Sequence, residues 1–260
     1  MIALVTGASS GIGKAMLPLM ARDKHDLVLV ARRAELLDAQ KHELESRFRR
    51  EGVRVWTIPL DLAKPGAAAE LFTRTRELGL DIDILINNAG FGLYGPFAEQ
   101  PLERLSQMID LNIGALTELT HLFLQPMKQR RRGRILQVAS TAAFQPGPRM
   151  AVYYATKAYV LSLSEALACE LEGSGVTVTA LCPGPTRSEF NDVAHFKLPA
   201  AFDKGVMSSE DVADIGYREM MNGKRVAVAG LGNRLMTIGS QLAPRGLVLA
   251  VANKLTRSRT

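Results

Sequence analysis

Three residues of the sequence have the types and spacing needed for proton transfer at a carbonyl. Tyr153 and Lys157 lie four residues apart in an apolar-periodic segment that predicts a helix to about residue 171, so both are expected to project into one site. A phenol has a pKa of about 10, and a neighbouring ammonium lowers it toward neutrality. Ser140 follows a predicted strand over residues 134–139 and can hydrogen-bond a substrate oxygen. Together they predict proton exchange at an oxygen whose carbon exchanges a hydride.

A glycine-rich segment lies near the start of the chain. Residues 2–6 predict a strand, residues 7–13 read Gly-Ala-Ser-Ser-Gly-Ile-Gly, and a helical pattern follows to about residue 22. Such a turn lets the backbone approach a pyrophosphate, which helix amides then hold. A second predicted strand, residues 27–31, ends in Arg32 and Arg33. Because arginine there pairs with a 2′-phosphate that a carboxylate would repel, the sequence favours NADP(H) over NAD(H).

Small and polar residues also follow three later strands. Asp61 and Leu62 follow a predicted strand at 53–58, Asn-Asn-Ala-Gly at 87–90 follows one at 82–86, and Pro-Gly-Pro-Thr at 183–186 follows one at 176–181. Predicted helices alternate with the strands, at residues 33–50, 65–78, 102–129 and 208–221, before a last strand at 226–229. This alternation predicts an α/β fold with a doubly wound parallel sheet of about seven strands and helices on both faces. The candidate chemistry falls at strand carboxyl ends, where such sheets bind ligands.

Length and composition suit one α/β domain over residues 1–230 with an extension over 231–260. The chain begins with a predicted strand and shows no charged leader. Cys169 and Cys182 lie on segments that are predicted to be buried, so we expect both to be reduced thiols. Both features predict a cytoplasmic protein. No apolar run approaches the length of about 18 residues that indicates a membrane span. The net charge of +6 resides in residues 224–260, which hold seven Lys or Arg and no Asp or Glu. We expect no nucleic-acid partner and interpret the basic run at 130–134 as a helix terminus.

The motifs of residues 2–190, and the order in which they follow one another along the chain, resemble those of the short-chain dehydrogenase/reductase family. The sheet of that family is of the Rossmann type. The resemblance implies that Tyr153 is the general acid in the reducing direction, that Ser140 steadies the substrate oxygen and that Lys157 holds the nicotinamide ribose. It implies that Asn112 anchors a water that relays protons through Lys157. It also implies a homodimer or homotetramer paired through the helices after residues 101 and 153, and no metal. The implied NADP(H) site comprises Gly7, Ser9, Ser10, Gly11, Ile12, Gly13, Arg32, Asp61, Leu62, Asn88, Ala89, Gly90, Tyr153, Lys157, Pro183, Gly184 and Thr186.

The irregular stretch at residues 186–207 lies where the family places its substrate lid, and long loops in compact domains often serve this purpose. We interpret His195 in this stretch as a surface histidine. The predicted substrate is a carbonyl on a hydrophobic body, such as an acyl chain, a steroid-like ketone or an aromatic ketone. That prediction rests on expected apolar walls: Phe91, Tyr94, Phe144, Met150, Phe190, Phe196, Leu198 and Phe202.

The extension after residue 230 carries two apolar-periodic segments separated by Pro244 and Gly246: Leu235, Ile238 and Leu242, then Leu247, Val251 and Leu255. We interpret them as helices that cover the fold or form an oligomer interface. A peripheral membrane anchor is the alternative, because the segments are basic and free of acidic residues. For the whole chain, an NADP(H)-dependent carbonyl reductase is the first hypothesis and a non-catalytic NADP(H)-responsive binding protein is the second. The complete Ser, Tyr, Lys and Asn set favours the enzyme.

Overall fold

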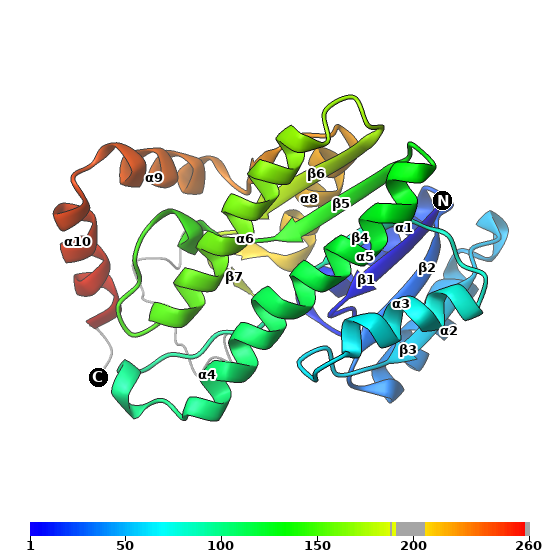
Figure 1. Cartoon of the computed structure of the whole chain (residues 1–260), viewed down its shortest axis with the longest axis horizontal. Helices are drawn as coiled ribbons and strands as arrows, with labels where there is room; N and C mark the ends of the chain where they lie inside the picture. The colour runs from blue at the N-terminus through cyan, green and yellow to red at the C-terminus, as the bar shows by residue number, and fades with distance from the viewer. Residues whose placement is uncertain (188, 191–205, 258–260) are drawn as a thin grey trace.

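A parallel sheet of seven strands forms the centre of the molecule (Figure 1). The computed structural model describes residues 1–187, 189–190 and 206–257. The strand order is β3-β2-β1-β4-β5-β6-β9, with parallel pairing throughout. This confirms the predicted fold class. The strands are β1 Ile2–Thr6, β2 Asp26–Ala31, β3 Val55–Pro59, β4 Ile82–Asn87, β5 Gly133–Val138, β6 Val176–Cys182 and β9 Val226–Val228.

Helices cover both faces of the sheet because alternate strand residues point to opposite sides. In β1, Ala3 and Val5 belong to the core on one face, and Leu4 belongs to the core on the other. The first core is closed by α1 Gly11–Arg22, α2 Ala34–Arg47 and α8 Ser209–Met221. The second is closed by α3 Ala67–Glu77, α5 Leu116–Gln129 and α6 Ala151–Glu170. The central strands are apolar along their whole length because both of their faces are buried.

The long helix predicted at residues 102–129 is three consecutive helical segments. These are α4 Leu102–Ile109, a π-helical stretch η3 Asp110–Ala115, and α5. A π-helix carries a wider turn than an α-helix and occurs frequently at functional sites. Here it contains Asn112, one of the predicted catalytic residues. Periodicity had indicated the helix but not this local widening.

Two further expectations are corrected. The helix predicted at residues 33–50 ends earlier, because α2 ends at residue 47 and a short 3₁₀ turn, η1 Arg49–Glu51, follows it. The strand predicted at residues 53–58 starts later, because β3 begins at residue 55. Cys169 is exposed, whereas Cys182 is buried as predicted. The reason is helical geometry: the side of α6 that faces the sheet carries Val160 and Ser164, and Cys169 lies off that side near the helix end.

The extension folds into α9 Leu231–Leu242 and α10 Arg245–Arg257, which lie together at one end of the molecule (Figure 1). Asn233 anchors α9 by donating to the Ala229 carbonyl over 2.7 Å, and α10 is held where the Tyr94 hydroxyl donates to the Thr256 carbonyl over 2.7 Å. Within the described residues, none of the helices combines the length and apolarity required to cross a bilayer.

Candidate active site

A cleft of about 790 Å³ lies at the carboxyl ends of the strands. Two of the predicted site residues, Gly13 and Asn112, lie outside its lining. The structure brings the other predicted residues together along its wall: Gly7, Ser9, Ser10, Gly11, Ile12, Arg32, Asp61, Leu62, Asn88, Ala89, Gly90, Ser140, Tyr153, Lys157, Pro183, Gly184 and Thr186.

The glycine turn between β1 and α1 brings backbone close to backbone. Gly7 has a φ of +64°, a conformation that favours glycine. A Cβ at Gly13 would lie 2.5 Å from the Gly7 carbonyl oxygen, so a side chain there would push α1 away from the turn. The Asn88 side-chain amide donates to the carbonyls of Thr6 over 2.9 Å and Gly7 over 3.1 Å. The end of β4 therefore holds the turn in place, and the first amides of α1 border the cleft where an anion can bind.

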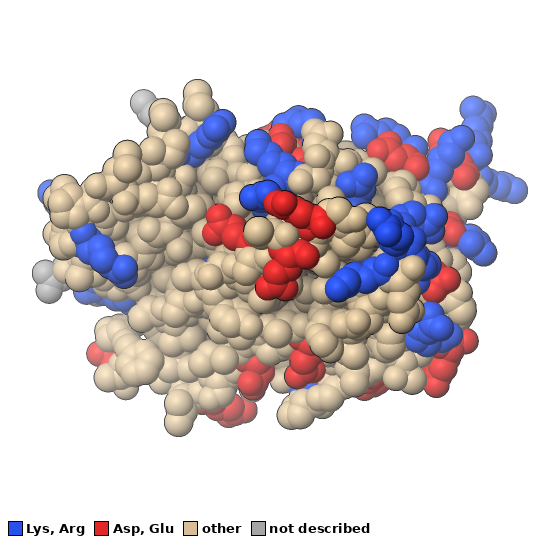
Figure 2. Space-filling view, turned by 45° about the horizontal axis from the view of Figure 1, so that its top comes forward, with Lys and Arg blue, Asp and Glu red and all other residues tan. Residues whose placement is uncertain are grey.

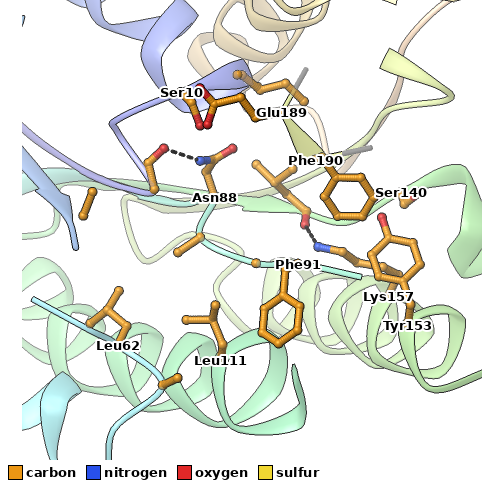
Figure 3. Close-up of a pocket in the computed structure, with 18 of the residues that line it drawn as sticks. Ser10, Leu62, Asn88, Phe91, Leu111, Ser140, Tyr153, Lys157, Glu189 and Phe190 are labelled. Atoms are coloured by element: carbon orange, nitrogen blue, oxygen red, sulfur yellow. Dashed lines mark hydrogen bonds between the residues drawn. The ribbon is translucent and has the colours of Figure 1, made fainter. Parts of the chain in front are cut away.

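Ser140, Tyr153 and Lys157 lie together at the other end of the cleft (Figure 3). Ser140 begins a short 3₁₀ helix, η4 Thr141–Phe144, and its hydroxyl accepts the Ala142 amide over 3.1 Å. Tyr153 and Lys157 are 9% and 6% exposed on one side of α6. The Lys157 ammonium donates to the Val138 carbonyl over 2.7 Å and lies 5.8 Å from the centroid of the Tyr153 ring. One carbonyl at the end of β5 thus orients the cation.

Burial moves the pKa values of Tyr153 and Lys157 in opposite directions. Desolvation lowers the pKa of Lys157 from 10.5 to about 8, because a buried site disfavours the ammonium. Burial also raises the pKa of Tyr153 above its usual value, and a hydrogen bond with Ser140 offsets only part of that rise. Lys157 is not among the groups that shift the pKa of Tyr153 here, because its ammonium is directed at the Val138 carbonyl, and the lowering that the sequence predicts stays a prediction. The phenol keeps its proton at neutral pH, which suits an acid, and Lys157 titrates closer to neutrality.

Asn112 lies behind the cleft wall and fixes the loop that follows β4. Its side chain accepts from the Phe91 amide over 3.1 Å and donates to the Phe91 carbonyl over 2.9 Å and to Thr156 Oγ1 over 3.1 Å. A Cβ at Gly90 would lie 2.9 Å from Asn112 Oδ1 and 3.7 Å from Lys157 Nζ. Asn112 and Lys157 therefore approach the same glycine. The water-anchoring role that the resemblance implies stays a prediction.

Among the cleft residues that the sequence did not assign to the cofactor are Glu189 and Arg33, although Arg33 was named beside Arg32 at the strand end. Arg33 donates to Ser9 Oγ over 3.1 Å and pairs with Glu189 over 2.9 Å. The Arg33 hydrogen bond is the main reason that the pKa of the Glu189 carboxyl is lowered, and a hydrogen bond from Ser10 contributes. The position of Arg33 directly after Arg32 at the end of β2 was the sequence signal that could have assigned it to the cleft. Nothing in the sequence indicated Glu189, because it meets Arg33 from 156 residues away.

The wall beside Tyr153 is mainly apolar among the described residues, although Arg104, which lies over the Phe91 ring, and Gln107 also line the cleft. The Phe190 ring lies 5.3 Å from the Tyr153 ring, centroid to centroid, and Phe91 and Met150 also line the cleft. Tyr94 and Phe144 were predicted as walls but do not line it. The Tyr94 hydroxyl binds α10, and Phe144 lines a second cavity beside α9 and α10. The other predicted residues of this loop lie outside the described residues: His195, Phe196, Leu198 and Phe202.

The residues present fit a nicotinamide dinucleotide. The glycines of the turn carry no Cβ, which at Gly13 would collide with backbone, so the turn packs tightly beside the cleft. The exposed Arg32 and Arg33 side chains border the same cleft beyond β2. Asp61 and Leu62 border it beyond β3, where a base can lie. In the described part of the chain, no group of three or more His, Cys, Asp or Glu side chains is placed to hold a metal ion.

The sheet, the glycine turn and the cleft define a nucleotide-binding α/β protein, and comparison with known proteins identifies its family. Residues 1–196 match the model of the short chain dehydrogenase family. A short-chain dehydrogenase from Sphingobium yanoikuyae, solved in complex with NADPH, superposes with a TM-score of 0.82 and 33% identity, covering 100% of this chain and 98% of that one. The chain belongs to the short-chain dehydrogenase/reductase family of oxidoreductases.

Two curated relatives have stated activities. The 7beta-hydroxysteroid dehydrogenase of Collinsella aerofaciens is 29% identical over 89% of this chain and 86% of its own length. The NADP-dependent 3-hydroxy acid dehydrogenase of Salmonella typhimurium is 37% identical over 71% of this chain and 72% of its own length. Both names describe the dehydrogenation of a hydroxylated substrate, a hydroxysteroid in the first and a 3-hydroxy acid in the second.

Proposed function

We propose that this protein is an NADP(H)-dependent oxidoreductase that interconverts a hydrophobic ketone and its secondary alcohol. The observation that carries the proposal is the convergence of Ser140, Tyr153 and Lys157 at one end of a cleft whose other end is a glycine turn. A nucleotide sensor has no need for a buried acid beside a buried amine. The enzyme is therefore favoured over the non-catalytic alternative.

In the proposed reaction the chain positions the substrate oxygen and moves one proton. When bound in the cleft, a nicotinamide cofactor would supply the hydride for the carbonyl carbon, or would accept it in the reverse direction. The Ser140 hydroxyl donates a hydrogen bond to the substrate oxygen, and the Tyr153 phenol transfers its proton there as the oxygen gains charge. The high pKa of the phenol keeps this proton in place until that moment. Lys157 can return a proton to Tyr153, since its own pKa is about 8.

The preference for NADP(H) rests on charge at the end of β2. Arg32 and Arg33 are exposed there, and Arg33 already holds one anion, the Glu189 carboxylate, over 2.9 Å. Arginine also pairs with phosphate through its planar fork of donors. A 2′-phosphate bound at the end of β2 would therefore lie near two guanidinium groups, those of Arg32 and Arg33. The end of this strand carries no carboxylate that would repel the phosphate.

The proposed substrate is hydrophobic because the described wall near the phenol is aromatic or aliphatic. Phe190 packs on Tyr153, and Phe91 and Met150 complete the apolar cluster around it. The 7beta-hydroxysteroid dehydrogenase relative supports a secondary alcohol on a largely apolar body. A panel of steroid, aromatic and acyl ketones, assayed with NADPH and with NADH, tests both substrate class and cofactor.

The direct test of mechanism is Tyr153→Phe, which removes the acid and keeps the ring that packs against Phe190. Turnover of the best ketone is expected to fall by about 10² or more, the scale of general acid catalysis, while NADPH binding is unchanged. Tyr154→Phe is the matched control, because Tyr154 borders the same cleft but its hydroxyl bonds Gln145. Near-normal turnover in Tyr153→Phe, or an equal loss in both variants, would refute the assignment.

A further inference from the structure

The cleft contains a cation that the proposed reaction does not use. Arg104 of α4 lines the cleft together with Gln107 from the next turn of the same helix. Residues three apart share one side of a helix, so both side chains project toward the cleft. The adjoining side of α4 carries Leu105 and Met108, which are buried in the apolar cluster around Tyr153. This packing holds α4 in place and keeps Arg104 at the cleft.

Two contacts fix the position of the Arg104 guanidinium. Its Cζ lies 4.6 Å from the centroid of the Phe91 ring, and its Nη1 donates to Gln107 Oε1 over 2.7 Å. Gly92, the residue after Phe91, lies close to the proposed acid, since a Cβ added there would be 3.2 Å from Tyr153 Cδ2. Residues 91 and 92 therefore link the two groups: the guanidinium covers the first, and the phenol ring lies beside the second.

The charge of Arg104 is not neutralised by the described residues. Among them, no Asp or Glu pairs with Arg104, and its hydrogen-bond partner is the neutral Gln107 amide. The carboxylates that line the described cleft are engaged elsewhere, Glu189 with Arg33 and Asp61 with the Ala63 amide. Most N–H donors of the guanidinium are thus available to a ligand. A neutral substrate that covered this charge would desolvate it without supplying a counter-ion, which costs free energy.

Arg104 lies away from the phosphate-binding end of the cleft. In Figure 3, Phe91 lies on one wall of the cleft, and Ser10 of the glycine turn lies on the opposite wall. Arg104 belongs to the first wall through its contact with the Phe91 ring. Arg33, which we assign to the 2′-phosphate, belongs to the second wall because it donates to Ser9 Oγ of the glycine turn. The guanidinium of Arg104 can therefore serve the substrate while the cofactor occupies its own site.

We propose that Arg104 binds a carboxylate of the substrate, so that the substrate is an oxo acid whose carbonyl and carboxylate are separated by an apolar body. This inference rests on the proposed function, which places the carbonyl at Ser140 and Tyr153. The apolar body would lie against Phe91, and the carboxylate would take two parallel hydrogen bonds from the planar guanidinium. A carboxylate is favoured over a phosphate because a single guanidinium meets a single negative charge.

The selectivity for an anion is expected to be local. On the face of the molecule that Figure 2 shows, Lys and Arg side chains lie among Asp and Glu side chains. That face therefore offers no single basic patch that would concentrate anions of every kind near the protein. A preference for the acid over its neutral ester would come from Arg104 itself and would be lost with it.

The test uses three methyl ketones of increasing length, 5-oxohexanoate, 7-oxooctanoate and 9-oxodecanoate, each assayed with NADPH beside its methyl ester. In Arg104→Gln, kcat/KM for the best acid is expected to fall by about 10- to 100-fold, the scale of a lost hydrogen bond to a charged group. The loss is expected in KM rather than in kcat, because the carboxylate lies away from the reacting atoms. The ester is expected to be unaffected. Arg104→Lys keeps the charge without the planar fork and is expected to lie between the wild type and Arg104→Gln.

Arg47→Gln is the matched control. Arg47 Cζ lies 5.2 Å from the centroid of the Phe48 ring at the end of α2, and neither residue lines the cleft. The control therefore removes an arginine from the same kind of ring contact at a remote place. It is expected to leave kcat/KM unchanged for every acid and ester.

A binding measurement separates this inference from the proposed function. Calorimetry on protein saturated with NADP⁺ compares octanoate, 1-octanol and octyl phosphate, which share one chain and differ in the head group. Octanoate is expected to bind the wild type at least about 10-fold more tightly than 1-octanol, and Arg104→Gln is expected to remove that difference. Because no turnover is needed, a protein that reduces no ketone but binds octanoate through Arg104 would refute only the proposed function.

Four results would overturn the inference. The first is a wild type that prefers neither any acid to its ester nor octanoate to 1-octanol. The second is an equal loss for acid and ester in Arg104→Gln, which would indicate a structural role. The third is weaker NADPH binding in Arg104→Gln with no change in the acid preference, which would assign the guanidinium to the cofactor. The fourth is a larger loss for octyl phosphate than for octanoate, which would identify a phosphate as the anion.

Discussion

Replacing Lys157 with methionine is expected to stabilise the fold while abolishing activity. At pH 7 the amine is charged in both the folded and the unfolded chain, so the folded state carries the cost of burying the charge. The fall in pKa from 10.5 to about 8 corresponds to about 3 kcal/mol, at 1.36 kcal/mol per pH unit. Methionine removes that cost but leaves the Val138 carbonyl without its 2.7 Å donor, a loss of about 1 kcal/mol. The net gain is about 2 kcal/mol.

The pH dependence of this gain identifies its cause. Between pH 8 and 10.5 the folded wild type releases a proton that the unfolded chain retains, so wild-type stability rises with pH. The advantage of the Lys157→Met variant must shrink over the same window and be close to zero at about pH 10. Urea unfolding in cofactor-free buffer, followed by circular dichroism at pH 7, 8.5 and 10, measures it directly.

The matched control is Lys64→Met, because Lys64 is exposed and its replacement is expected to change stability by less than about 0.5 kcal/mol at each pH. A Lys157→Met variant that is less stable than wild type at pH 7 would refute the reasoning. So would a stability gain of the same size at pH 7 and pH 10, since that gain would come from packing rather than from the buried charge.

Two further predictions concern the cofactor end of the cleft. Glu189→Gln removes the carboxylate that pairs with Arg33, and exposed ion pairs of this kind are worth about 0.2–1 kcal/mol. NADPH is therefore expected to bind the variant about 1.5- to 5-fold more tightly in a fluorescence titration. An equal gain in NADH affinity would exclude competition between Glu189 and the 2′-phosphate. Gly13→Ala places a methyl group 2.5 Å from a backbone oxygen and is expected to destabilise the fold by about 1–3 kcal/mol and to weaken NADPH binding. Gly114→Ala is its control, because an added Cβ there meets nothing within 4 Å; in this helical stretch it is expected to raise stability by about 0.5–1 kcal/mol and to leave NADPH binding unchanged.

Local chemistry explains why much of the site was visible in the sequence. Gly7 adopts a φ that glycine favours, and Gly13 admits no side chain, so the turn needs these residues at these positions. Tyr153 and Lys157 share a face because four residues are slightly more than one helical turn of about 3.6 residues. Strand carboxyl ends meet at one edge of a parallel sheet, so motifs spread over 180 residues were predicted to meet there. These features depend on neighbours in the chain.

The pKa values and the partners were decided by tertiary structure, since they depend on residues far away in the chain. Desolvation by the whole fold raises the pKa of Tyr153, and the Val138 carbonyl of a neighbouring strand draws the Lys157 ammonium toward itself. Arg33 meets Glu189 across the cleft, a contact that no local pattern encodes.

The extension shows the same division between sequence and tertiary structure. The sequence by itself predicted an apolar-periodic helical segment that carries Leu235, Ile238 and Leu242, because periodicity is a property of one segment. It could not determine which side of α9 meets the protein, since that depends on what the rest of the fold places beneath it. The structure sets Thr237 inward and Leu242 outward, with 3% and 82% of their surfaces exposed. An apolar stripe read from sequence therefore predicts a contact, and only the packed fold shows whether that contact has already been made.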